Sequence, residues 1–402
     1  MKDVPVIEVK NLSKVFGRNP KQALKRLDDG LSKQAILKET GNTVGVNRAS
    51  FSVKEGEIFV IMGLSGSGKS TLIRLVNRLI EPTEGSILID GEDLSKMDQK
   101  ALRNVRREKL SMVFQSFALF THRTILENAA FGLEIQNIPK EERDKKAEEA
   151  LEMVGLGGYF EQYPSQLSGG MQQRVGLARA LANDPAVLLM DEAFSALDPL
   201  IRKEMQDELI DLQASMKKTI LFITHDLDEA LRLGDRIALM KDGSIVQIGT
   251  PEEILVNPAD EYVEKFVEDV DISKILTAQH IMKRPETVII ENHGPRVALE
   301  RMRDVGLSGV YVVDNKRNLK GYVTADDAAD AVKKEVRSLE GILSNDIPKV
   351  ERDTPMNEIF NIIHDSPTPV AVVENGKLLG VIVRGAVIAA LSKDGEVNIN
   401  DA

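Results

Sequence analysis

Short, uniformly apolar runs separated by longer amphipathic stretches mark the first two-thirds of the chain. Three such runs, Gly56–Met62, Pro185–Met190 and Thr219–Ile223, have the length of single strands and are rich in aliphatic residues. Because they are apolar at successive rather than alternate positions, they are expected to be buried on both faces, as strands of a parallel sheet are. Thr71–Val76 begins a helix after the first run. The pattern predicts an α/β domain in which buried strands alternate with helices.

The last third of the chain contains a weak internal repeat. Its first copy has apolar runs at Gly309–Asp314 and Leu319–Thr324, and its second copy has them at Pro369–Glu374 and Leu378–Val383. The second pair is joined by Asn375-Gly376, a strong signal for a tight β-hairpin. Each copy is therefore expected to be a strand, a turn and a strand, flanked by helices.

Composition narrows the setting of these domains. The chain has 402 residues, no cysteine and a net charge of −11, so disulfides, thiolate metal sites and general nucleic-acid binding are not expected. Its start lacks the apolar core of a signal peptide, and no apolar run approaches the roughly 20 residues that a membrane helix needs. We expect a cytosolic protein, and any membrane-spanning segment must come from other chains.

The first apolar run leads directly into a phosphate-binding motif. Gly63–Ser70 fits the pattern G-x-x-x-x-G-K-S, and strand before it and helix after it make a chance glycine-rich turn a poor alternative. Its backbone N–H groups and the helix N-terminus should surround a phosphate, while Lys69 reaches the β/γ oxygens and Ser70 ligates Mg²⁺. The candidate nucleotide-binding residues here are Gly63, Ser65, Gly66, Gly68, Lys69, Ser70 and Thr71.

Two further strand ends carry candidate chemistry. Pro185–Met190 ends in Asp191 and Glu192, and Thr219–Ile223 is followed closely by His225. Asp191 is expected to hold Mg²⁺ and Glu192 to act as general base, while His225 contacts the γ-phosphate. A lone Asp-Glu pair or a lone histidine is more often structural, so this interpretation depends on the phosphate loop. Gln115, after Leu110–Phe114, is ambiguous by itself.

Together these motifs resemble those of ABC ATPases, over about residues 6–265. Gln115 matches the Q-loop glutamine of that family, which serves catalysis and Mg²⁺ binding, and Leu167–Arg174 matches its signature. The resemblance implies a head-to-tail homodimer in which Ser168, Gly169 and Gly170 complete the ATP site of a second copy, and Asp198 in its D-loop is a further nucleotide-binding candidate. Phe16 matches the aromatic residue that stacks on adenine, although a core phenylalanine is a rival interpretation. Ser116–Phe120 is either a docking surface for a permease helix or ordinary core.

An insertion at residues 18–45 narrows the resemblance to the ATPases of glycine betaine/proline importers. Pro20–Asp28 and Ser32–Glu39 are expected to form two short helices. Their apolar side is predicted to contain Leu24, Leu27, Leu31, Ile36 and Leu37. The basic residues of the insertion are Arg18, Lys21, Lys25, Arg26, Lys33 and Lys38. This basic charge either faces anionic lipid or is simply solvated.

The internal repeat resembles a tandem pair of CBS domains, a family that senses adenosine-containing ligands. We place the ABC ATPase domain at residues 1–270, the first CBS domain at residues 271–335 and the second at residues 336–402. Thr324 and Asp327 match the ribose-contacting T-x-x-D of the family, whereas the second copy departs from it and has Arg384 nearby. An adenine nucleotide or cyclic di-AMP is the implied regulatory ligand; a purely structural dimerisation module is the alternative.

The sequence is thus expected to encode the ATPase of an importer for a compatible solute such as glycine betaine. Two chains would bind ATP and drive two integral membrane permease subunits, with a substrate-binding domain or protein, from the cytoplasmic face of the membrane. Import of another amine or amino acid is one alternative. A soluble ABC ATPase that takes no part in transport is another.

Overall fold

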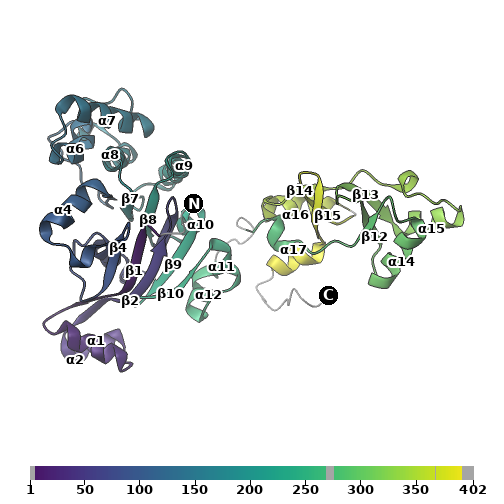
Figure 1. Cartoon of the computed structure of the whole chain (residues 1–402), viewed down its shortest axis with the longest axis horizontal. Helices are drawn as coiled ribbons and strands as arrows, with labels where there is room; N and C mark the ends of the chain where they lie inside the picture. The colour runs from purple at the N-terminus through teal and green to yellow at the C-terminus, as the bar shows by residue number, and fades with distance from the viewer. Residues whose placement is uncertain (1–4, 269–275, 367, 392–402) are drawn as a thin grey trace. The chain divides into compact units, whose positions relative to one another are not determined.

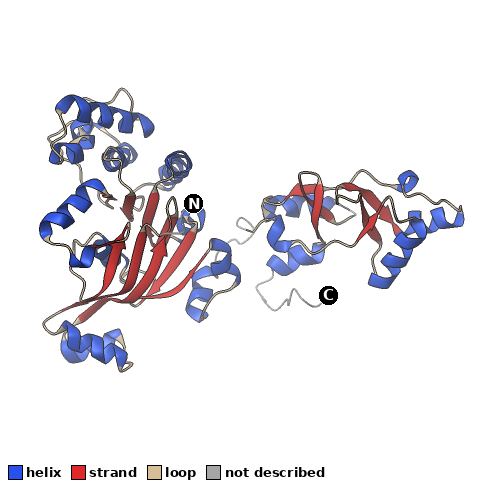
Figure 2. Ribbon diagram, viewed as in Figure 1, coloured by secondary structure: helices blue, strands red, loops and turns tan. Residues whose placement is uncertain are grey.

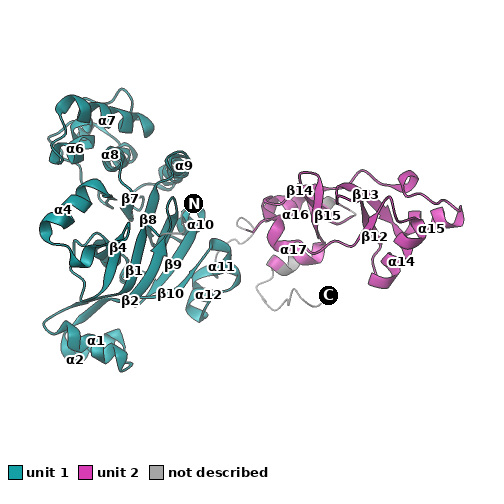
Figure 3. Ribbon diagram, viewed as in Figure 1, with its two compact units in different colours: residues 1–269 teal, residues 270–402 magenta. Residues whose placement is uncertain are grey.

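A computed structural model of the chain describes residues 5–268, 276–366 and 368–391. It contains two compact units, residues 1–269 and residues 270–402 (Figure 3). Each unit has its own sheets and its own core.

The larger unit is built around a six-stranded sheet with the order β10-β9-β3-β8-β7-β6 (Figure 1). Only the edge strand β10 runs antiparallel to its neighbour. The strands are β3 (Ile58–Met62), β6 (Leu110–Val113), β7 (Val187–Asp191), β8 (Thr219–Thr224), β9 (Arg236–Lys241) and β10 (Ser244–Gly249). Every residue of β3, β7 and β8 is buried, so the prediction of an α/β domain with buried parallel strands is confirmed.

A second, antiparallel sheet has the order β2-β1-β4-β5. It comprises β1 (Ile7–Phe16), β2 (Thr43–Val53), β4 (Glu84–Ile89) and β5 (Glu92–Asp93). Side chains from both sheets and from α3 (Lys69–Val76) form one core, which includes Ile87, Phe59 and Leu72. This core fixes α3 and the loop before it in place.

The insertion between β1 and β2 forms two helices, α1 (Pro20–Asp28) and α2 (Lys33–Thr40), as predicted. They have a small core of their own, made of Val15, Ala23, Leu24, Ile36 and Val44. The predicted apolar side is wrong at Leu37, which is 49% exposed. The insertion is therefore a packed helical pair on the end of the antiparallel sheet.

The remaining helices of this unit lie around the sheets, and α5, α6, α7 and α8 pack against one another in a helical group that contacts the main sheet through α8 and β6 (Figure 2). Their bounds are α4 (Gln99–Glu108), α5 (Ile125–Ala129), α6 (Phe131–Ile135), α7 (Lys140–Met153), α8 (Gly169–Leu181), α9 (Pro199–Met216), α10 (Leu227–Leu233), α11 (Pro251–Val256) and α12 (Glu261–Val267). Within the described part of the chain, no helix combines the length and the apolar character that crossing a membrane requires.

The smaller unit has two three-stranded sheets, β11-β12-β13 and β14-β15-β16. The strands are β11 (Thr287–Ile289), β12 (Gly309–Val313), β13 (Leu319–Thr324), β14 (Lys349–Glu351), β15 (Val370–Glu374) and β16 (Lys377–Ile382). The helices are α13 (Ala278–Ile281), α14 (Pro295–Val305), α15 (Ala325–Lys333), α16 (Met356–Asp365) and α17 (Arg384–Leu391). The two hairpins are confirmed, while the parallel strands β11 and β14 were not anticipated.

Candidate nucleotide site

The phosphate loop joins β3 to α3 and depends on glycine at two close approaches. A side chain at Gly68, where φ is 109°, would stand 2.3 Å from the Gly45 carbonyl oxygen. One at Gly63, where φ is 150°, would stand 2.3 Å from the Met240 carbonyl oxygen. These positions allow the loop to pack against β2 and β9 while its backbone N–H groups curve inward.

Lys69 carries a buried charge at the centre of this loop. It is 4% exposed, and its Nζ donates to the carbonyls of Gly63 (2.8 Å) and Leu64 (3.2 Å). Burial lowers the pKa of Lys69, while the nearby carboxylates of Glu192 and Asp191 oppose that shift. A partly desolvated ammonium of this kind gains strongly from an anionic ligand.

Ser70 and Asp191 meet beside this lysine. The Ser70 hydroxyl donates to Asp191 Oδ1 over 3.1 Å. Burial raises the pKa of Asp191, and the bond from Ser70 partly counters it. A hydroxyl and a carboxylate side by side suit Mg²⁺, which binds through few protein oxygens and leaves its other positions to phosphate and water. The two residues therefore fit the predicted metal site.

Glu192 is the meeting point of three strand ends. It lies directly after β7 in the left-handed region, with φ of 49°, an uncommon conformation for a glutamate. Its Oε2 accepts a bond from Gln115 Nε2 (3.3 Å), which follows β6, and lies 3.3 Å from His225 Nδ1, which follows β8. The structure thus brings together the residues predicted for catalysis, with one carboxylate oxygen of Glu192 close to two side chains.

A cavity of about 560 Å³ opens in front of these residues. It is lined by Phe16, Lys33, Thr43, Val44, Gly45, Leu64, Ser65, Gly66, Gly68, Lys69, Ser70, Thr71, Glu192 and His225. Phe16 is 41% exposed, so the interpretation of this ring as core is wrong. Lys33, Thr43 and Gly45 were not predicted to line it. The role of Gly45 becomes visible only in the folded structure. A side chain at this position would stand 2.9 Å from the Phe16 ring, so glycine keeps that face of the ring clear.

The signature residues begin helix α8 and do not line this cavity. The Ser168 hydroxyl accepts a bond from the Met171 backbone N–H (3.3 Å) and caps α8. Asp198 caps α9 in the same way through the N–H of Ile201 (3.1 Å). A single chain therefore does not bring Ser168, Gly169, Gly170 or Asp198 to its own phosphate loop.

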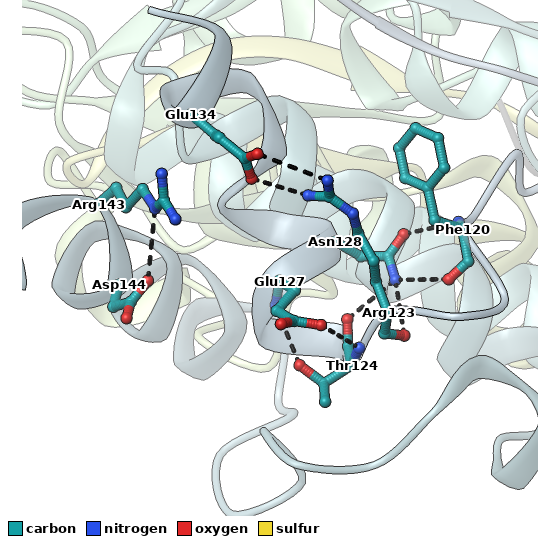
Figure 4. Close-up of polar contacts among 8 residues, drawn as sticks. All are labelled: Phe120, Arg123, Thr124, Glu127, Asn128, Glu134, Arg143 and Asp144. Carbon is teal, nitrogen blue, oxygen red and sulfur yellow. Dashed lines mark hydrogen bonds and ion pairs between the residues drawn. The ribbon is translucent and has the colours of Figure 1, made fainter. Parts of the chain in front are cut away.

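The loop after Gln115 is held from two sides. Arg179 on α8 donates to the carbonyls of Phe117 (3.2 Å) and Ala118 (2.7 Å). The buried Asn128 accepts from the Phe120 N–H (2.8 Å) and donates to the carbonyls of Phe120, Arg123 and Thr124 (Figure 4). Ser116–Phe120 is therefore neither free surface nor plain core, because its backbone is fixed while several side chains stay partly exposed.

The predicted regulatory residues of the smaller unit all have local partners. The Thr324 hydroxyl accepts from the Asp327 N–H (3.1 Å) and donates to its carboxylate (2.6 Å), which caps α15. Arg384 donates to the carbonyls of Ile363, His364 and Ser366 at the end of α16. Arg384 is thus held in one position.

Comparison with known protein families divides the chain into the same two parts as the two compact units of the structure. The family model described as ABC transporter matches residues 46–195, and that described as CBS domain matches residues 278–334 and 336–393.

Similar proteins span nearly the whole chain. The glycine betaine/carnitine transport ATP-binding protein GbuA of Listeria monocytogenes is 62% identical over 98% of this chain and 99% of its own length. The glycine betaine transport ATP-binding protein OpuAA of Bacillus subtilis is 61% identical over 97% of this chain and 93% of its own. ProV of Escherichia coli, a glycine betaine/proline betaine transport system ATP-binding protein, is 51% identical over 98% of this chain and 99% of its own length.

Among solved structures, the dimeric ATP-binding cassette MJ0796 bound to ADP and Pi matches with a TM-score of 0.52 and 34% identity. The match covers 61% of this chain and 98% of that one. The chain therefore belongs to the ABC transporter ATPases, in the group of glycine betaine transport ATP-binding proteins, and it carries a tandem pair of CBS domains.

Proposed function

We propose that this chain is the ATP-hydrolysing subunit of an importer for a compatible solute, and that the solute is glycine betaine. The observation that carries the proposal is the convergence of Gln115 and His225 on the carboxylate of Glu192, next to the phosphate loop. Glycine betaine is favoured because it appears in the names of the three relatives described above.

In this proposal the residues of one chain bind ATP and activate water. Phe16 stacks on the adenine, and Lys69 pairs with the charge of the phosphates. The phosphates are surrounded by the cavity-lining residues Ser65, Gly66, Gly68 and Thr71, in the loop that begins at Gly63. Ser70 and Asp191, with Gln115, hold Mg²⁺, which when bound neutralises phosphate charge. Glu192 takes a proton from water, while His225 and Gln115 keep its carboxylate oriented.

A second copy of the chain completes the site. Ser168, Gly169, Gly170 and Asp198 of each protomer cap the nucleotide held by the other, with the N-terminus of α8 facing the γ-phosphate. This head-to-tail arrangement is supported by the separation of these residues from the chain's own cavity and by the dimeric state of the similar cassette structure. A two-fold dimer contains two such composite sites.

Two permease subunits, with a substrate-binding domain or protein, are the partners that the dimer drives at the cytoplasmic face of the membrane. Their contact is proposed at Ser116–Phe120, whose backbone is fixed by Arg179 and Asn128. A cavity of about 250 Å³ nearby is lined in part by Phe114, Phe131 and Ile135 and offers apolar surface to a helix. Because Gln115 and Ser116–Phe120 are consecutive in the chain, ATP binding and permease contact are mechanically linked in this proposal.

Two elements are proposed to regulate the cycle. The insertion presents basic residues, such as Lys21 and Lys25, to anionic lipid. The test is a variant whose basic residues between Arg18 and Lys38 are neutralised. If its ATPase rate depended on salt in the same way as that of the original chain, this proposal would be overturned. The CBS pair binds an adenine nucleotide or cyclic di-AMP near Thr324, Asp327 and Arg384. Titrating the full-length Lys69→Ala variant, in which the phosphate loop is expected to lose most ATP binding, with AMP, ATP and cyclic di-AMP tests that ligand.

Replacing Glu192 with glutamine tests the catalytic assignment. We expect Glu192→Gln to lower ATP hydrolysis by at least about 100-fold, because a positioned general base contributes a factor of this order. ATP binding should persist, since Lys69, Ser70 and Asp191 are unchanged. The exposed Glu55 offers a matched control, and Glu55→Gln should hydrolyse ATP at the normal rate. Substantial hydrolysis by Glu192→Gln would remove Glu192 from this role.

Identifying the transported solute requires the intact transport complex. Purified with its membrane subunits, the chain should show an ATPase rate that rises with glycine betaine more than with other amines or amino acids. Stimulation by a different solute alone would replace glycine betaine as the cargo and leave the ATPase assignment intact.

A further inference from the structure

Lys33, in the insertion, reaches the nucleotide cavity. It is the first residue of α2 and lines the same cavity as Phe16 and Lys69. Its Nζ donates to the carbonyl oxygen of Gly66, in the middle of the phosphate loop, over 3.3 Å. The insertion therefore contributes a cation to a site that is otherwise built from the two sheets and the phosphate loop.

The position of Lys33 is unfavourable for the helix that carries it. A helix N-terminus has a partial positive charge, so a lysine in the first turn is repelled, and α2 has no acidic residue in that turn to offset it. Ser32 caps the helix by accepting from the Ala35 N–H (3.2 Å). Since the cap needs only Ser32, the stability of α2 does not account for the lysine.

The insertion is fixed strongly enough to hold this ammonium in place. At its base, Asn42 is buried, and its Oδ1 accepts a bond from the Asn19 N–H (3.4 Å). A side chain at Gly17 would stand 2.0 Å from that same oxygen, so the two ends of the insertion are in close contact. An ion pair between Asp28 and Arg48 (2.5 Å) also ties α1 to β2. Lys33 is thus presented by a packed element.

We infer that Lys33 is a nucleotide-binding residue and that its ammonium pairs with the phosphate chain of ATP. This rests on the proposed ATP site. Lys33 lines the cavity that would hold the phosphates, and its Nζ lies 3.3 Å from the carbonyl oxygen of Gly66 in the surrounding loop, so its ammonium is within reach of the ligand's negative charge. Binding of ATP would then hold α2 against the phosphate loop. The basic insertion and the catalytic centre would share one ligand.

Affinity measurements on the full-length chain test this inference. Using isothermal titration with Mg-ATP, we expect Lys33→Ala to weaken binding by about fivefold, the effect of losing roughly 1 kcal/mol from a partly exposed charge pair. Lys33→Arg should restore binding to within about twofold, because it returns the charge. The loss should shrink as salt is raised. Thermal melting without nucleotide should be no lower for Lys33→Ala than for the original chain, since the lysine opposes the helix dipole.

Two further variants show whether a change in ATP affinity comes from Lys33, from the charge of the whole insertion or from an incorrect ATP site. Lys21 lies in the first turn of the sister helix α1 and outside the residues that line the cavity, so Lys21→Ala should bind ATP normally. Lys69→Ala should lose most ATP binding if the proposed site is correct. Normal affinity in Lys33→Ala together with loss in Lys69→Ala would overturn only the inference about Lys33. Equal losses in Lys21→Ala and Lys33→Ala would also overturn it, because the insertion's charge as a whole would then be responsible. Unchanged binding in Lys69→Ala would instead contradict the ATP site.

Discussion

The two regions that would make up one ATP site are built in opposite ways. The phosphate-loop region holds charges that folding has desolvated: Lys69 has a lowered pKa, Asp191 has a raised pKa, and burial is the main cause of both shifts. Glu192 beside them has a left-handed backbone. The signature region, by contrast, consists of ordinary helix starts that are capped by Ser168 and Asp198.

This difference indicates where ligand binding changes stability. Buried charges and an uncommon backbone conformation destabilise the unliganded chain and are relieved by a phosphate and a cation. Well-capped helix ends add stability and have no such deficit. The phosphate-loop region is thus prepared for ligand within one chain, whereas the signature region has its proposed role only opposite a second copy.

The largest expected effect comes from placing a charge on the signature. A side chain at Gly169 has room within the chain, because its nearest neighbour outside the helix would be the Phe117 ring at 3.6 Å. Gly169→Asp should therefore fold and bind ATP normally. Its carboxylate would face the partner's γ-phosphate, so ATP hydrolysis should fall by about 100-fold or more.

Mixing two inactive variants is the control for this effect. In the proposed dimer, Gly169→Asp and Lys69→Ala damage opposite halves of a composite site, so each mixed dimer would keep one intact site. With random pairing and independent sites, an equal mixture should recover about a quarter of normal hydrolysis. Failure to recover any activity, or loss of ATP binding by Gly169→Asp alone, would contradict the division into two halves.

A smaller effect, on stability, distinguishes the phosphate-loop region. Asp191→Asn keeps an oxygen to accept the Ser70 bond but removes the buried charge. The folded pKa of Asp191 is raised, so its protonated form is favoured in the folded state. That contribution to stability is fully present below the unfolded pKa and is lost as pH rises through the folded pKa. Near neutral pH the variant should melt a few degrees higher without nucleotide, and it should lose ATP hydrolysis because Asp191 is proposed to hold Mg²⁺.

The pH dependence of melting is the control for Asp191→Asn. Its advantage over the original chain should disappear when the pH is lowered below about 4, where the original carboxylate is also neutral. An equal or lower melting temperature of Asp191→Asn at neutral pH would mean that the ionised Asp191 carboxylate does not destabilise the folded chain.

Much of this site could be predicted because its motifs follow fully apolar strands. Runs such as Val187–Asp191 indicate directly that the strand is buried on both faces. The carboxyl ends of parallel strands meet at one edge of the sheet, which brings Gln115, Glu192 and His225 together. The parallel strands β11 and β14 were missed because each has only three residues, too few to show a period.

Lys33 and Leu37 show where a pattern of residue types is insufficient. The sequence groups Lys33 with the other cations of the insertion, and only its place in the cavity lining and its hydrogen bond to the Gly66 carbonyl distinguish it from them. Leu37 follows Ile36 directly, and neighbouring helical positions point about 100° apart, so burial of one leaves the other exposed. Such choices depend on tertiary contacts rather than on local periodicity.

The smallest expected effect is on the signature region and has the opposite sign to that of Asp191→Asn. Ser168→Ala removes the hydroxyl that accepts the Met171 N–H, so the unliganded chain should lose about 1 kcal/mol and melt roughly 2–4 °C lower. Ser168→Asp, which can still accept that bond, is the matched control and should melt close to the original temperature. If Ser168→Ala melted higher instead, the signature would be strained like the phosphate loop. A change of sign between Asp191→Asn and Ser168→Ala, measured in the same buffer, is therefore the sharpest evidence that one half of the site is destabilised for its ligand and the other is not.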